Sequence, residues 1–156
     1  MAYATPDRER PSREGGQSLV EFALVLPVLL IVVFGIIDFA MGMRSYVALA
    51  NATREGARYA AIGAVFGTQA DCGVTDTTVV GRVCKTAEGL NKTRLTVVTD
   101  PTKVYPNGMA PGNSVVVKAT YEYRFITPLG AIVDFFSAGS VGTSITLTSE
   151  TDMRLE

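Results

Sequence analysis

Cys72 and Cys84 are the only cysteines of the chain, so they alone could form a covalent cross-link within it. Their spacing is not that of a CxxC redox motif, and two cysteines alone make a poor metal site, so no bound metal is expected. In an oxidising compartment the pair predicts a structural disulfide, which closes a short loop and contributes about 2–4 kcal/mol. In a reducing compartment the two residues would be independent thiols.

Two carboxylates lie near the two ends of the most apolar stretch of the sequence, which runs from Leu19 to Ile37. Glu21 lies near its start, and a carboxylate near the edge of hydrocarbon is costly unless it is paired. The alternative for Glu21 is that its side chain reaches the lipid headgroups from the helix end. Asp38 follows the stretch directly, and the sequence indicates no role for it beyond marking the outer boundary.

No catalytic constellation is evident in the sequence. The chain has no histidine, which is the commonest general base and metal ligand. No glycine-rich phosphate cradle follows a strand, no serine has an elbow motif, and no paired carboxylates lie in an evident cleft. Its 14 basic and 15 acidic residues nearly cancel, so no surface for nucleic acid is expected. We therefore expect neither an enzyme nor a nucleic-acid binder, and no cofactor.

The apolar stretch predicts one membrane-spanning helix. Its 19 residues would rise about 28 Å, close to the thickness of bilayer hydrocarbon. From Phe22 to Ile37 no residue is charged, which leaves no polar face for a helix at the surface of a soluble protein. Pro27 lies inside this stretch, where it should weaken the preceding turn and kink the helix, as membrane helices tolerate.

The helical pattern continues beyond the apolar stretch. Residues 39–62 are rich in Ala, Met and Arg and contain no proline, so one rod of roughly 65–70 Å is expected over residues 17–62. This continuity argues against a cleaved secretory signal, although Ala40-Met41-Gly42 has suitable spacing for signal peptidase. Arginines before the stretch favour a cytoplasmic N-terminus. The remaining chain then lies outside, which agrees with a disulfide.

Residues 63–156 predict a small domain with alternating strands. Strict alternation over residues 114–126 places on one face Val115, Val117, Ala119, Tyr121, Tyr123 and Phe125. Residues 93–99 and 143–155 also alternate, the latter with Ile145, Leu147, Met153 and Leu155 on one side. Short helices are expected at residues 76–90, starting at an acidic N-cap, and at 128–136. Three antiparallel strands laid on the rod would make an α+β fold.

The N-terminal segment resembles a known family. The string GQSLVEF, from Gly16 to Phe22, places a glutamate five residues after a glycine, behind a charged leader and at the start of a long apolar helix. Together with GIIDFAMG and NATREGARYAA, it resembles the TadE-like family of minor pilins, or pseudopilins, of the tight-adherence pilus system. Asp38 matches the family's GxxDF pattern. The last strand, ending TSETDMRLE, is also similar to the family's ending.

The resemblance implies three parts: a prepilin leader at residues 1–16, a transmembrane and extended helix at 17–62, and a pilin-like extracytoplasmic domain at 63–156. It implies that a prepilin peptidase cuts between Gly16 and Gln17. The new α-amine would be protonated near neutral pH and would be a suitable partner for Glu21. In pilins this amine belongs to a neighbouring subunit, so Glu21 and the adjoining Phe22 would form an assembly motif.

A structural subunit of a Flp-type pilus is the function that the resemblance implies, anchored by a single pass in the bacterial inner membrane or incorporated into a surface pilus. The implied partners are the prepilin peptidase, other pilins and pseudopilins, the inner-membrane assembly platform and membrane lipid. The alternative is a membrane-anchored extracytoplasmic binding module that is never cleaved. Cleavage after Gly16 distinguishes the two hypotheses.

Overall fold

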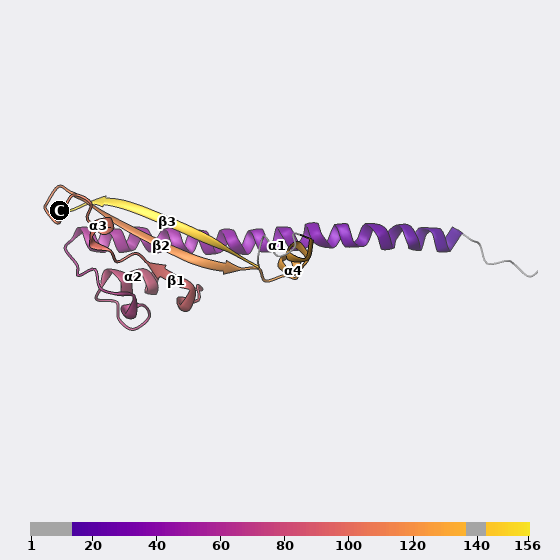
Figure 1. The fold of residues 1–156 in the computed structure, drawn as a ribbon, viewed down its shortest axis with the longest axis horizontal. Helices are drawn as coiled ribbons and strands as arrows, with labels where there is room; N and C mark the ends of the chain where they lie inside the picture. Colours follow the sequence, from indigo (N-terminus) through magenta and orange to yellow (C-terminus); the bar gives the residue numbers. More distant parts are fainter. Residues whose placement is uncertain (1–13, 137–142) are drawn as a thin grey trace, which may run out of the picture.

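One long helix organises the molecule. The computed structural model describes residues 14–136 and 143–156, and its first element, α1 (Glu14–Ala61), contains 48 residues. We call residues 14–37 the inner half of α1 and residues 38–61 its outer half. The inner half projects from the remaining chain, which gathers around the outer half (Figure 1). The rod expected over residues 17–62 is therefore present and begins three residues earlier. Pro27 lies inside α1, and the helix continues past it. Residues 1–13 of the expected leader lie outside the described residues.

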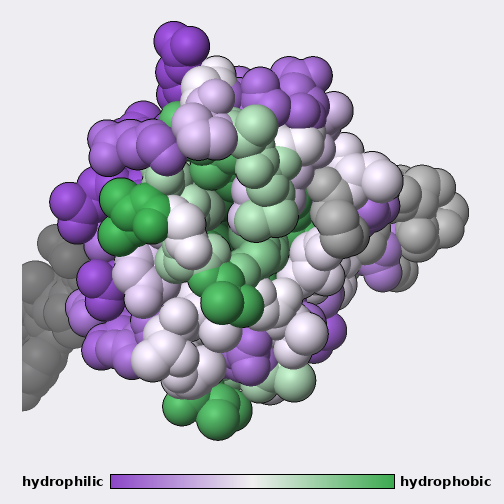
Figure 2. Space-filling view, turned by 90° about the vertical axis from the view of Figure 1, so that its left-hand side faces the viewer, coloured by the Kyte–Doolittle hydropathy of each residue, from purple (hydrophilic) through white to green (hydrophobic). Residues whose placement is uncertain are grey.

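The outer end of α1 stops at a glycine. Gly63 adopts a φ of 82°, which residues with a side chain rarely adopt, and its N–H donates to the carbonyl of Ala60 at 3.0 Å. The N–H of Glu156 donates to the carbonyl of Ala61 at 3.2 Å. The last residue of the chain therefore returns to the end of α1. Figure 2 shows this end of the molecule: hydrophobic side chains gather near the centre of the face, and hydrophilic ones lie mainly along its upper and left-hand edges.

The remaining chain builds a three-stranded antiparallel sheet. Its strands are β1 (Leu95–Val97), β2 (Ser114–Arg124) and β3 (Ser144–Arg154), in the order β1-β2-β3. Tyr121 of the central strand pairs with Leu95 of β1 and with Leu147 of β3. The predicted α+β fold, a long helix packed against a small antiparallel sheet, is confirmed. We call residues 63–156 the head.

Short helices connect the strands. They are α2 (Val79–Thr86), α3 (Pro101–Val104) and α4 (Leu129–Phe136), with 3₁₀ turns η1 (Gln69–Asp71) and η2 (Lys92–Arg94). The helix expected over residues 76–90 is thus shorter, and its N-cap is Thr78, whose hydroxyl accepts the N–H of Gly81 at 3.1 Å. The expected acidic cap was wrong because Asp76 lies before the cap and pairs with Lys85 instead.

The inner face of the sheet packs on α1. On β2 the predicted face is buried from Val115 to Tyr123, whereas Phe125, just beyond the strand, is half-buried. On β3 the middle of this face is polar, because Ser149 and Thr151 lie there, and Ile145 remains 42% exposed. The apolar positions predicted for β3 therefore lie at the margins of the core, and small polar residues occupy its centre.

The expected disulfide between Cys72 and Cys84 is present, with the two Cα atoms 5.2 Å apart. It joins the turn that follows η1 to α2, and Cys84 is fully buried in the core. The disulfide therefore fixes the loop after α1 to the helix that packs on α1.

Candidate functional site

The inner half of α1 makes little contact with the head. Within the part of the chain that the structure describes, α1 is the one helix long and apolar enough to cross a membrane, and its most apolar window is not buried at all. Leu19, Phe22 and Leu24 are each more than 60% exposed. Large apolar side chains exposed all around a helix suit a lipid environment. A single apolar helix that could anchor the chain in a membrane is therefore present.

The predicted processing residues lie in the first turn of α1. Gly16 is exposed and has no heavy atom within 4 Å of the position that a Cβ would occupy. The first four N–H groups of a helix have no partner within it, and glycine is a poor helix former. The bond between Gly16 and Gln17 therefore lies where little free energy is needed to unwind the backbone. Glu21 and Phe22, one turn further on, are also exposed.

Asp38 has a structural position that the sequence did not predict. It lies directly after the apolar stretch and is only 3% exposed. Its Oδ1 accepts the backbone N–H of Ile126 at 2.8 Å and that of Thr127 at 3.3 Å, and its Oδ2 accepts the Thr127 hydroxyl. The Tyr123 hydroxyl donates to the same carboxylate at 3.4 Å. Asp38 therefore ties α1 to the segment between β2 and α4.

These hydrogen bonds also orient the start of α4. The hydroxyl of Thr127 accepts the N–H of Leu129, the first residue of α4, at 3.2 Å while donating to Asp38. Burial, followed by the nearby charge of Asp38, raises the pKa of Tyr123, which keeps its hydroxyl protonated as a donor. A carboxylate that accepts several hydrogen bonds is compensated for its desolvation. Asp38 thus joins α1 to the head where the inner half ends.

A second set of hydrogen bonds between α1 and the head lies at Thr53, inside the NATREGARYAA motif. The Thr53 hydroxyl is fully buried; it donates to the carbonyl of Ala50 at 3.0 Å and lies 2.9 Å from the Ser149 hydroxyl. Thr151 donates to Thr53 at 3.2 Å. The polar centre of β3 is therefore matched by a polar residue on α1, which leaves none of these hydroxyls without a partner.

Gly56 allows α2 to approach α1 closely. A Cβ placed on Gly56 would lie 2.3 Å from Cγ2 of Val83, which is buried and branched. Ala57 and Ala60 of the same motif are also fully buried. Small residues in this part of α1 therefore provide the surface on which α2 packs.

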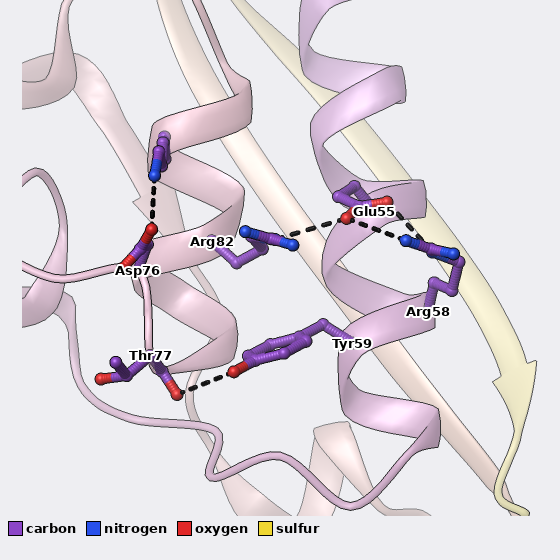
Figure 3. Close-up of polar contacts among 7 residues, drawn as sticks. Glu55, Arg58, Tyr59, Asp76, Thr77 and Arg82 are labelled. Carbon is purple, nitrogen blue, oxygen red and sulfur yellow. Dashed lines mark hydrogen bonds and ion pairs between the residues drawn. The ribbon is translucent and has the colours of Figure 1, made fainter.

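Charged groups surround this packing surface on the solvent side. Glu55 pairs with Arg58 at 3.2 Å and, across to α2, with Arg82 at 3.3 Å (Figure 3). Arg82 also stacks 5.3 Å from the ring centre of Tyr59, whose hydroxyl donates to the carbonyl of Thr77 at 3.4 Å. Because Arg58 is 73% exposed, its pair with Glu55 contributes little to stability. The pair within α1 is thus a solvated surface contact, and Arg82 of α2 extends it.

The structure separates the predicted site residues into two groups. Gly16, Gln17, Glu21 and Phe22 lie on the exposed inner half of α1, whereas Asp38 and the disulfide belong to the packing of the head. No group of three metal-ligating acidic, cysteine or histidine residues exists among the described residues. The sequence showed Asp38 only as a charged residue next to an uncharged stretch. It could not reveal the hydrogen-bond partners of Asp38, which lie 85 to 89 residues away.

Residues 16–58 match the family model of TadE-like proteins. The matched range begins at Gly16 and includes Glu21, Asp38, Thr53 and Gly56. The resemblance found in the sequence is therefore confirmed over this segment, which indicates a protein associated with the Tad pilus. No curated protein and no solved structure matches the chain.

Proposed function

From this match we propose that the chain is a minor pilin or pseudopilin, a structural subunit for assembly of tight-adherence pili, and that prepilin peptidase cleaves it between Gly16 and Gln17. The observation that carries the proposal is the division of α1. Its outer half is built into the core of the head, while its inner half exposes almost every large apolar side chain. Such a surface requires lipid or other apolar helices around it.

Glu21 gives this surface a means of fixing register. Cleavage would leave a protonated α-amine on Gln17 at the end of an apolar helix. A carboxylate in a low-dielectric setting attracts such an amine more strongly than it would in water. A pair between Glu21 of one subunit and the amine of a neighbouring pilin would therefore set how far one helix lies along the other.

The proposed location is the bacterial inner membrane, with the N-terminus in the cytoplasm and the head outside. The disulfide between Cys72 and Cys84 supports this orientation, because disulfides persist on the oxidising side of that membrane. The partners are the prepilin peptidase, other pilins and pseudopilins, the assembly platform and membrane lipid. The role is structural, without an enzymatic activity of its own.

Intact-mass measurement and N-terminal sequencing of the protein purified from its native membrane test the proposal. We expect a chain that begins at Gln17, because the bond before it lies in an exposed, easily unwound turn. Gly16→Leu should block processing, since its bulky side chain replaces a small one beside the cut. Gly16→Ala is the matched control and should still be processed.

Two results would contradict the proposal. A mature protein that keeps residues 1–16 would favour the uncleaved binding module. A mature protein that begins at Met43 would mean conventional signal cleavage, with loss of the anchor.

A further inference from the structure

The end of the head nearest the N-terminus lies level with the outer end of the apolar stretch. The carboxylate of Asp38 accepts hydrogen bonds from the backbone N–H groups of Ile126 and Thr127. A Cβ placed on Gly35 would lie 3.9 Å from Cδ2 of Leu129, the first residue of α4. Gly35 is two residues inside the stretch, which corresponds to about 3 Å along the helix axis. The start of α4 therefore lies at the depth of the apolar helix.

This end of the head exposes several apolar side chains. Ile126 is 63% exposed, and Phe39, on the neighbouring turn of α1, is 70% exposed. An apolar groove of about 420 Å³ opens here between α1 and the sheet, with a lining that includes Met43, Phe125, Leu129 and Ile145. Within α4 the one charged residue is Asp134, which is half-buried. We call Phe39, Ile126, Leu129, Ile145 and this groove the foot.

The foot adjoins the apolar surface of α1, because Gly35 of α1 lines the same groove as Leu129 and Ile145. If residues 19–37 cross the bilayer, a surface held against Gly35 lies at the edge of the hydrocarbon. The carboxylate of Asp38 carries no uncompensated cost at that depth, because it accepts hydrogen bonds from the head. Tyr46 and Tyr123 also line the groove, and tyrosines are common at the boundary between hydrocarbon and headgroups.

We propose that the foot inserts into the leaflet of the bilayer on the head side, and that acyl chains of phospholipids fill its groove. This inference rests on the membrane anchoring in the proposed function. The protein then contacts the membrane at two places, through α1 and through the segment of the head that begins α4. Asp38 sets the depth of the foot in the bilayer, because it fixes the foot to the last turn of the membrane-spanning segment.

The chain contains no tryptophan, so single substitutions provide reporters of depth. Full-length Ile126→Trp protein is reconstituted into phosphatidylcholine vesicles without brominated lipid, or with lipids brominated either near the headgroup end or near the methyl end of the acyl chain. Leu29→Trp, in the apolar stretch, reports insertion of α1. Met109→Trp is the matched control, because Met109 is 72% exposed and lies beside Ala61, at the opposite end of the head.

We expect brominated lipid to quench Ile126→Trp severalfold more than Met109→Trp, at every ratio of protein to lipid. Quenching of Leu29→Trp together with an unquenched Ile126→Trp would overturn the foot and leave the anchor intact. Absence of quenching at both positions would overturn the anchor as well. A blue-shifted but unquenched Ile126→Trp that depends on protein density would mean that a second copy covers the foot, which also overturns the proposal.

Discussion

The two halves of α1 are both rich in apolar residues, yet they differ in side-chain size and in exposure. In the inner half the residues are mainly Leu, Val, Ile and Phe, and Leu24 is 71% exposed. In the outer half Leu49 is fully buried, and much of the remaining contact surface consists of Ala, Gly and Thr. Large side chains maximise apolar area toward lipid, whereas small ones allow α2 and the sheet to approach closely.

This difference explains why one uninterrupted helix can serve two environments. The inner half approaches the head at Gly35 but exposes most of its large apolar side chains, so many apolar residues would serve along the rest of it. In the outer half, Gly56 must leave room for Val83 of α2. Thr53 must provide a hydrogen-bond partner for the polar centre of β3. Substitutions in the two halves should therefore affect different properties of the protein.

The largest difference in stability is expected between variants that carry the same substitution, leucine to alanine, in the two halves. Leu49→Ala removes a fully buried side chain and should destabilise the head by about 2–5 kcal/mol. Leu24→Ala, the matched control, should leave the stability of the head unchanged. Thermal unfolding of the full chain in mild detergent, followed by the near-ultraviolet circular dichroism of its tyrosines, measures both effects. Equal melting temperatures for the two variants would mean that the outer half is not part of the core.

A smaller difference in stability is expected between alanine substitutions of two glycines of α1. Gly56→Ala should destabilise the head by about 1–3 kcal/mol, although alanine favours helix, because its Cβ would overlap Val83. In Gly42→Ala the new Cβ would lie 3.8 Å from the ring of Tyr123, an ordinary contact. The Gly42 variant should therefore be as stable as the parent chain, or slightly more stable. The same melting experiment checks this pair, and a Gly56→Ala protein at least as stable as Gly42→Ala would refute the close approach.

Much of the fold could be predicted because its signals are local. The apolar stretch, the proline-free continuation and the strict alternation of β2 are each readable within a short window. The centre of β3 was harder, since Ser149, which is buried, and Thr151, which is half-buried, find their partner in Thr53 across the core. The N-cap of α2 was misplaced because both Asp76 and Thr78 are common capping residues.

The candidate site divides in the same way. The motif around Gly16 and Glu21 depends on spacing along the chain, so a single sequence reveals it. The role of Asp38 depends on hydrogen bonds to residues 123–127, which only the tertiary structure brings to it. Likewise, the requirement for glycine at position 56 follows from the position of α2 and not from a local turn.

The same acid-to-amide substitution in the two halves of α1 tests the central claim most directly. Each variant is expressed in the native host, and its processing, its recovery with pilin partners and piliation are measured. Glu55→Gln should weaken two ion pairs near the surface, each worth about 1 kcal/mol or less, and should assemble normally. Glu21→Gln should be processed but should accumulate in the membrane without its partners, and piliation should be impaired. Recovery of Glu21→Gln with its partners at the level of Glu55→Gln, together with normal piliation, would contradict the account.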